Sequence, residues 1–211
     1  MFLVAGEVIE EVSGKTWDTF VEKRLLEPLQ MEYTTTSLAG ITDNTQLAYP
    51  HSKRFFNRFG GPVAEEPSNL EQIGPAGSMR TNVSDMNHWL SFQLNNGRYE
   101  NQRLVDETHM LELRKPVITL PKDEMGPVSN ATDTLQYGMG WFLMEYRNTD
   151  AVVHGGGYPG QRSYVGLLPE KDLGVVILSN KGGTEITQAL TYYIFDLFLD
   201  RDPLDWSEKF N

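Results

Sequence analysis

The residues with the clearest chemical potential form one short segment, Val152-Val153-His154-Gly155-Gly156-Gly157, in which an imidazole precedes three glycines. The valines are typical of a strand, and glycine on a strand lets another backbone approach closely. An extended substrate could pair with such a strand while free backbone amides face its carbonyl group. Acyl transfer needs this arrangement, because donors must point to where negative charge develops.

Two other interpretations compete for this segment. A glycine-rich stretch before Tyr158-Pro159-Gly160 is commonly a simple hairpin loop, and from the residues alone this interpretation is favoured. The glycine spacing also satisfies G-x-G-x-x-G. A dinucleotide site, however, needs a helix to begin there, and Pro159 is followed by the strand-like run Arg162–Leu168. The dinucleotide interpretation is therefore rejected.

Metal and cofactor chemistry find no support in the sequence. The four histidines, His51, His88, His109 and His154, share no metal-ligand spacing, so we expect neither a metal nor a cofactor. The chain contains no cysteine, which excludes thiolate catalysis and disulfides. G-x-S-x-G is absent as well, so these residues offer no nucleophile elbow.

The elements that must position the glycine segment fall into two groups. Helical patterns come first, over 2–13, from Thr16 to Pro28, after Asn82 and after Asp106. Residues 116–135 have the composition of a long loop. Strand-like runs separated by short turns then predict an antiparallel sheet with strands at about 136–146, 151–157, 162–169 and 173–179. A final amphipathic helix over 184–199 completes an α+β fold.

Composition limits the partners. Of the 211 residues, 18 are Lys or Arg and 29 are Asp or Glu, which gives a formal charge of −11. A field of that sign repels nucleic acid and anionic lipid surfaces. We expect one domain over 1–200, helical over 1–135 and formed by the sheet and final helix over 136–200. The acidic segment 201–211 is expected to be a linker or tail.

The order of the segments resembles the serine β-lactamase and penicillin-binding-protein family, in its class C-like branch with esterases and D-amino-acid peptidases. Each matching block is weak alone, and the resemblance rests on their shared order from about residue 3 to about residue 206. The blocks are Gly6–Trp17, Leu26–Thr34, Pro75–Trp89, Tyr137-Gly138-Met139-Gly140-Trp141, His154-Gly155-Gly156 and Gly160–Asn180.

The sequence departs from that family in its catalytic motifs. The family's chemistry uses a serine in S-x-x-K and a tyrosine in Y-x-N. These residues contain no S-x-x-K, and Tyr99-Glu100-Asn101 fits Y-x-N only by chance, well past the expected position. The resemblance implies that both motifs lie on a missing N-terminal segment, so we expect the chain alone to be inactive.

The resemblance assigns roles to the glycine segment. His154 would present a polar or positive group to the substrate, and the backbone N–H of Gly157 would be one oxyanion donor. Gly155 and Gly156 would form the floor on which the substrate lies. The implied substrate is a small molecule or peptide, namely a β-lactam, a D-alanyl peptide or an ester. The implied location is periplasmic or extracellular.

Three further expectations follow. A non-catalytic peptide-binding module, or a remnant of an enzyme, would use the same groove and is the alternative function. A third candidate function is that of an unrelated α+β enzyme working through Tyr99 or paired glutamates. Self-association through the strand at 137–146 or the face of helix 184–199 is also expected, because a missing segment would leave an edge and an apolar face exposed.

Overall fold

The computed structural model describes residues 1–41, 47–53 and 60–210, and they form an α+β fold built around one antiparallel sheet. The α-helices are α1 (Phe2–Ser13), α2 (Trp17–Val21), α3 (Gly74–Gly77), α4 (Val83–Leu94), α5 (Glu107–Leu113), α6 (Ile186–Phe198) and α7 (Trp206–Lys209). The segment η1 (Glu22–Leu26) is π-helical, and η2 (Leu38–Gly40), η4 (Glu71–Ile73), η5 (Lys122–Ala131) and η6 (Pro169–Lys171) are 3₁₀ segments. Two small hairpins are β1 (His51–Ser52) with β2 (Val63–Ala64) and β3 (Arg98–Tyr99) with β4 (Gln102–Arg103).

The main sheet has the strand order β10-β9-β8-β7-β6-β5, with every neighbouring pair antiparallel. Short connections join its consecutive long strands, so the chain returns on itself at each turn. The strands are β5 (Ile118–Thr119), β6 (Thr132–Tyr137), β7 (Phe142–Tyr146), β8 (Thr149–Tyr158), β9 (Gln161–Leu168) and β10 (Leu173–Ser179).

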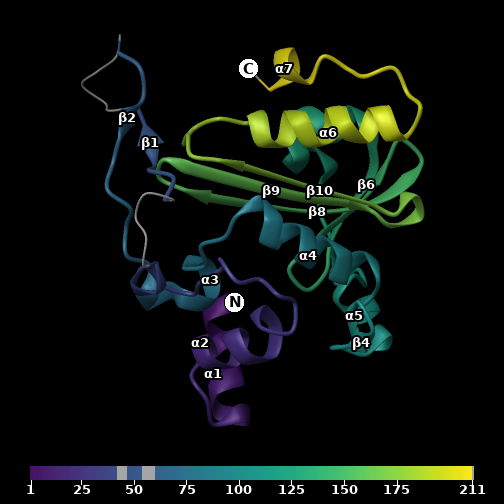
Figure 1. Cartoon of the computed structure of the whole chain (residues 1–211). Coiled ribbons are helices and arrows are strands. Elements are labelled where there is room, and N and C mark those ends of the chain that lie inside the picture. The colour runs from purple at the N-terminus through teal and green to yellow at the C-terminus, as the bar shows by residue number, and fades with distance from the viewer. Residues whose placement is uncertain (42–46, 54–59, 211) are drawn as a thin grey trace.

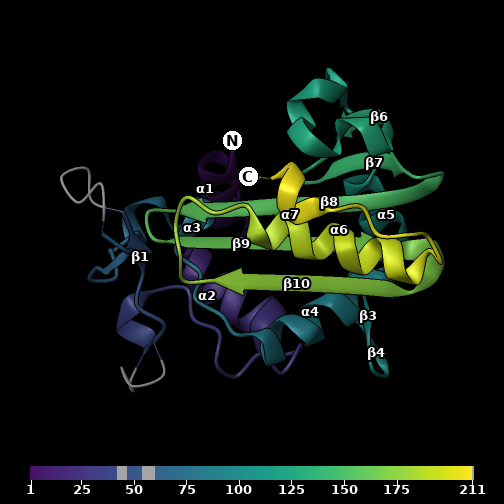
Figure 2. The ribbon, with the colours of Figure 1, turned by 90° about the horizontal axis from the view of Figure 1, so that it is seen from above.

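Helices cover both faces of the sheet (Figure 1). The helix α6 lies along β9 and β10 on one face, as the view from above shows (Figure 2), and α4 packs under β10 on the other. The largest core cluster joins the α6 face of the sheet to Tyr192, Phe195 and Trp206. The second face packs Leu90 of α4 against Leu167. A separate cluster around Trp17 and Phe92 holds the N-terminal helices together.

The N-terminal helices begin and end where their capping residues predict. Gly14 follows α1, and the Thr16 side chain accepts the amide of Thr19 at the start of α2. Asn82 accepts the amide of Asp85 and caps α4, but the Asp85 carboxylate does not return to the cap. It accepts the hydroxyl of Thr34 at 2.7 Å, so it connects α4 to the segment after η1. Among the described residues, no helix combines the length and apolar character needed to cross a membrane.

The strand expected over 136–146 is two strands, and the loop expected over 116–135 is partly regular. The chain turns over 138–141 before β7 begins, where Gly140 has a φ of 84° and the amide of Gly138 donates to the carbonyl oxygen of Trp141 at 2.8 Å. Glycine is required at 138, because a Cβ there would lie 2.6 Å from the carbonyl oxygen of Leu113. Since β7 pairs with β6 and β8, it is not the exposed edge expected for self-association; the edge strands of the sheet are β5 and β10.

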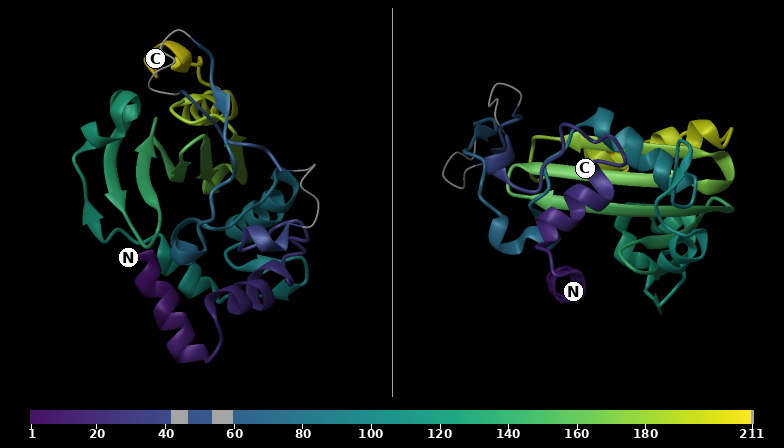
Figure 3. Two further views of the ribbon diagram at one scale, coloured as in Figure 1. Left: turned by 90° about the vertical axis from the view of Figure 1, so that its left-hand side faces the viewer. Right: turned by 60° about the horizontal axis from the view of Figure 1, so that its bottom comes forward.

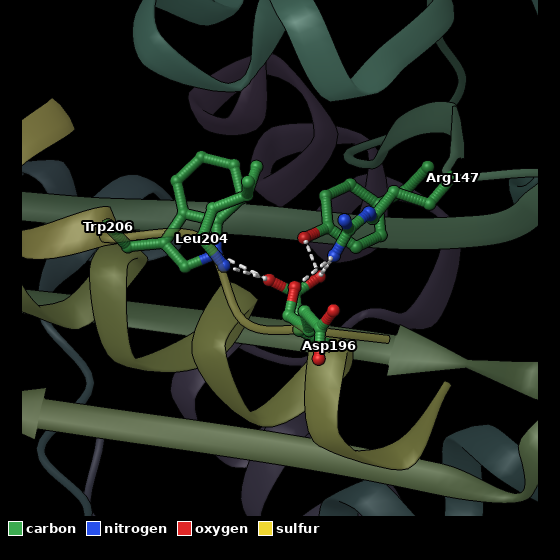
Figure 4. A network of polar contacts seen from close by, with 6 residues as sticks. Arg147, Asp196, Leu204 and Trp206 are labelled. Carbon is green, nitrogen blue, oxygen red and sulfur yellow. Dashed lines mark hydrogen bonds and ion pairs between the residues drawn. The ribbon is translucent and has the colours of Figure 1, made fainter. Parts of the chain in front are cut away.

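The C-terminal segment packs back onto the sheet around a buried carboxylate (Figure 4). Asp196 of α6 is fully buried and accepts hydrogen bonds from Tyr146 Oη and Arg147 Nη1, each at 2.6 Å. Its other oxygen accepts the backbone amide of Leu204 at 3.1 Å and the indole N–H of Trp206 at 2.8 Å. Within the segment expected to be a linker or tail, Trp206 is thus part of the core.

Candidate active site on the open edge of strand β8

The strand β8 extends beyond its neighbour β7. The two strands pair from Tyr146 opposite Thr149 to Phe142 opposite Val153, and β7 begins there. On its other side β8 stays paired with β9 as far as Tyr158 opposite Gln161. The second half of β8, from His154 onward, therefore has one paired side and one open side, and its three glycines are exposed.

The turns at the two ends of β8 fix which backbone groups face the open side. Arg147 and Asn148 both have positive φ in the two-residue turn before Thr149, which makes Tyr146 and Thr149 a hydrogen-bonded pair. Alternation then directs the amides of odd-numbered β8 residues toward β7. The two-residue turn with Gly160 at φ 81° independently directs the even-numbered amides toward β9.

The amides of Gly155 and Gly157 consequently point to the side where β7 has ended. Those of His154 and Gly156 are directed to β9, opposite Val165 and Ser163. Two backbone donors spaced two residues apart on an open strand edge suit an extended ligand and can stabilise an anionic oxygen.

The imidazole of His154 is half-buried among aromatic rings beside this edge. Its Nε2 lies 3.5 Å from Tyr137 Oη, and the ring of Phe2 approaches it edge-on at a centroid distance of 6.3 Å. Burial lowers the pKa of His154 below its ordinary value of 6.5, while a backbone hydrogen bond with Gly155 acts in the opposite direction. Near neutral pH the ring is therefore mainly uncharged, and it offers a hydrogen bond rather than a positive charge.

At each of the three glycines a Cβ would come close to a side chain of β9. A Cβ on Gly156 would clash with the Ser163 hydroxyl, and one on Gly155 would lie 3.2 Å from the ring of Tyr164. A Cβ on Gly157 would lie 3.0 Å from Arg162 Nη1, so the guanidinium of this β9 residue lies close to the Cα of Gly157. Beyond it, an open cavity of about 520 Å³ is bounded by the tip of the β8–β9 hairpin and residues 181–183.

The structure brings all four predicted site residues, His154, Gly155, Gly156 and Gly157, onto one strand. Sequence reasoning missed Arg162, although the two-residue turn at Pro159-Gly160 was visible and places residue 162 opposite residue 157. It also missed the position of Phe2, for which the sequence carries no signal. Within the described residues no group of three or more His, Asp or Glu side chains is arranged to hold a metal ion.

Comparisons with known proteins agree with this architecture. Protein flp of Staphylococcus aureus (strain MW2) is 27% identical over 179 residues, which are 83% of this chain and 31% of that protein. N-acetylmuramyl-L-alanine amidase of Bacillus subtilis (strain 168) is 24% identical over 202 residues, covering 88% of this chain and 44% of the relative. The chain thus spans less than half the length of these two relatives.

Solved structures show the same fold. The octameric penicillin-binding protein homologue from Pyrococcus abyssi superposes with a TM-score of 0.81 at 21% identity, covering 96% of this chain and 42% of the other. The D-amino acid amidase from Ochrobactrum anthropi SV3, complexed with L-phenylalanine amide, has a TM-score of 0.65 at 20% identity and covers 85% and 48%. The family model described as Beta-lactamase matches residues 1–198, and the chain belongs to that family.

Proposed function

We propose that this chain is the oxyanion-binding and substrate-aligning part of a serine hydrolase that works through an acyl-enzyme. The observation that carries the proposal is the open half of β8, where the amides of Gly155 and Gly157 face away from β9. In this function Gly157 donates its N–H to the developing oxyanion, and the glycines at 155 and 156 form the floor under an extended substrate.

The substrate class is an amide, peptide or ester. Support comes from the relatives, since their names describe an N-acetylmuramyl-L-alanine amidase and a D-amino acid amidase, both of which act on amide bonds. The mainly uncharged His154 serves as a hydrogen-bonding group facing the substrate and the catalytic tyrosine of the family. The serine nucleophile, its lysine and that tyrosine are supplied by polypeptide outside these 211 residues, which contain no S-x-x-K.

Labelling with a fluorophosphonate tests this division of roles. The 211-residue chain alone should not be labelled, because no acyl-enzyme can form without the nucleophile. Joined to the N-terminal part of a β-lactamase-family enzyme that carries the S-x-x-K serine, it should be labelled on that serine. In the joined protein, G157P removes the N–H and should lower turnover about 10²–10³-fold.

The matched control is G157A, which keeps the N–H and places a Cβ 3.0 Å from Arg162 Nη1, so the end of that side chain must shift by only a few tenths of an ångström. It should retain turnover within about tenfold of the parent. Labelling of the chain alone would contradict the proposal. Equal turnover of the G157P and G157A variants of a folded joined protein would also contradict it. A joined protein that binds peptide without being labelled would support the alternative, a non-catalytic binding module.

We also propose that the chain self-associates through the outer face of α6. The exposed residues of α6 are all apolar or aromatic, and a contiguous apolar surface of this kind is normally covered. They are Ile186, Leu190, Tyr193, Leu197 and Phe198, each 42–56% exposed. The Pyrococcus abyssi homologue is described as octameric, which supports assembly in this fold.

A further inference from the structure

We propose that Arg80 is a positioning residue for the open half of β8, because its guanidinium holds the tip of the β8–β9 hairpin and with it the Gly157 donor. This inference rests on the proposed function, in which Gly157 supplies an oxyanion donor. Gly157 is the next-to-last residue of β8, and Tyr158 opposite Gln161 forms the last pair of the ladder. Since the ends of a hairpin open more easily than its middle, a donor in this place needs support from outside the hairpin.

Arg80 connects the hairpin tip to segments far away in the sequence. Its Nη1 donates to Gln161 Oε1 at 3.3 Å, and its Nη2 donates to the carbonyl oxygen of Ser68 at 2.7 Å. The side-chain amide of Gln161 donates in turn to the carbonyl oxygen of Ala48 at 3.2 Å. The Gln161 side chain is therefore held at both atoms of its amide group, with Arg80 on one side and Ala48 on the other.

The backbone that carries Arg80 is itself fixed. Its amide donates to the carbonyl oxygen of Thr35 at 2.8 Å, and the amide of Thr35 donates to the carbonyl oxygen of Arg80 at 3.0 Å. Asn82 caps α4 two residues later, and α4 packs on β10 of the same sheet. Since the planar guanidinium loses little freedom when both of its ends are bonded, Arg80 acts as a rigid spacer between this frame and the hairpin tip.

Arg114 provides a matched comparison within the same chain. Both guanidinium groups are partly buried, and in each the Nε is buried without a hydrogen-bond partner among the described residues. Burial lowers the pKa of both, and each donates to a backbone carbonyl oxygen and to a side-chain amide oxygen. The acceptors of Arg114, however, are Gln93 and Asn96, around the C-terminal end of α4. Loss of either arginine should therefore destabilise the fold similarly, and only loss of Arg80 should loosen the hairpin tip.

Amide hydrogen exchange of the chain tests the inference without any hydrolysis. R80M keeps the aliphatic stem and removes every donor, so the amides of Tyr158 and Gln161 should exchange about tenfold faster relative to the amide of the buried Val152. R114M should leave this ratio unchanged, although its urea midpoint should fall about as far. Q161M removes the acceptor of Arg80 and should reproduce the faster exchange. The double variant R80M/Q161M should exchange no faster than either single variant, because both substitutions remove the same interaction.

In the joined protein the positioning role should appear in the rate of turnover rather than in substrate binding. R80M should lower kcat about tenfold and leave KM within about twofold, because the Gly157 donor remains but is misplaced for a charge that develops only in the transition state. R114M should leave kcat within about twofold of the parent. R80K has a single ammonium group that can reach one of the two acceptors, so its kcat should lie between those of R80M and the parent.

Equal exchange ratios in R80M and R114M, or equal falls of kcat in the two variants, would overturn the inference. Faster exchange at the tip in R80M alone, combined with an inert joined protein, would overturn only the proposed function. Should R80M fail to fold, Q161M decides both readouts, because Gln161 is partly exposed and its substitution breaks the same link to Arg80.

Discussion

The two ends of the β7–β8 hairpin differ in whether their polar groups have hydrogen-bond partners within the chain. At the turn end, the Asp196 carboxylate is fully buried and accepts four hydrogen bonds from Tyr146, Arg147, Leu204 and Trp206 (Figure 4). At the other end β7 has already stopped, and the amides of Gly155 and Gly157 face open space. The left view in Figure 3 shows the N-terminal end of α1 on one side of the sheet and α6 on the other.

The difference separates a structural site from a functional one. A buried carboxylate must be saturated by donors, since an unsatisfied buried charge is very costly. Its saturation leaves nothing for a ligand to bind, and its role is to fix the C-terminal segment on α6. Exposed donors without an acceptor cost little in water, and they keep their full hydrogen-bonding capacity for a substrate. The following experiments test this contrast from the largest expected effect to the smallest.

Replacing the saturated carboxylate should give the largest loss of stability. D196A leaves the buried donors of Tyr146 and Trp206 and the partly buried Arg147 without their acceptor, so the free energy of unfolding should fall by about 3–5 kcal/mol. Urea unfolding followed by tryptophan fluorescence measures this loss. The control is D150A on the same hairpin, where the exposed side chain should contribute less than about 0.5 kcal/mol. Equal losses in the two variants would contradict the structural role of Asp196.

Adjacent proline substitutions on β8 should differ sharply in stability. G156P removes an amide directed to β9 and should cost about 3 kcal/mol more than G156A, which carries the same Cβ clash with Ser163. G155P removes an amide that faces the open edge, and it should differ from G155A by less than about 1 kcal/mol. Urea midpoints of the four variants measure both differences. A larger proline effect at 155 than at 156 would reverse the strand alternation described here.

The closed end should also make stability fall in alkali. Burial and the neighbouring Asp196 raise the pKa of Tyr146 well above its ordinary value of 10. Above pH 10 the unfolded chain loses this proton while the folded chain retains it, so folding loses about 1.4 kcal/mol per pH unit for this residue. Y146F should remove that contribution and make the decline between pH 10 and pH 11.5 shallower. An unchanged slope in Y146F would contradict the link between Tyr146 and the buried network.

The outer face of α6 gives the smallest expected effect on the folded chain itself. L190K places a charge on the exposed apolar face and should change the free energy of unfolding by no more than about 0.5 kcal/mol. It should nevertheless reduce self-association, because a charge must be desolvated when copies meet through this face. Sedimentation equilibrium at high concentration measures the change. A parent chain that is monomeric under these conditions would refute self-association through α6.

Local signals predicted much of the fold. The capping residues Thr16 and Asn82 located two helices, and the short turns before β8 and β9 predicted antiparallel neighbours. The strand expected over 136–146 was wrong, because the chain turns between Tyr137 and Phe142. There the amide of Met139 donates to the carbonyl oxygen of Leu113, a long-range contact that no local pattern predicts. The α+β class was confirmed, since it depends on the order of elements rather than on their bounds.

Prediction of the site was limited by long-range contacts. The sequence placed His154 and its glycines on a strand, but which amides are open depends on where β7 begins. The segment around Trp206 was expected to be a linker or tail, because its acidic composition is typical of a solvated segment. Its packing depends on Asp196, ten residues away on another element and buried only in the folded chain.

Amide hydrogen exchange along β8 tests the central claim most directly. If the second half of β8 is open on one side, protection should alternate, with slow exchange at His154 and Gly156 and fast exchange at Gly155 and Gly157. Uniform protection across residues 154–157 would contradict the open edge. Slow exchange at Gly155 and Gly157 with fast exchange at Gly156 would show that the donors point the other way.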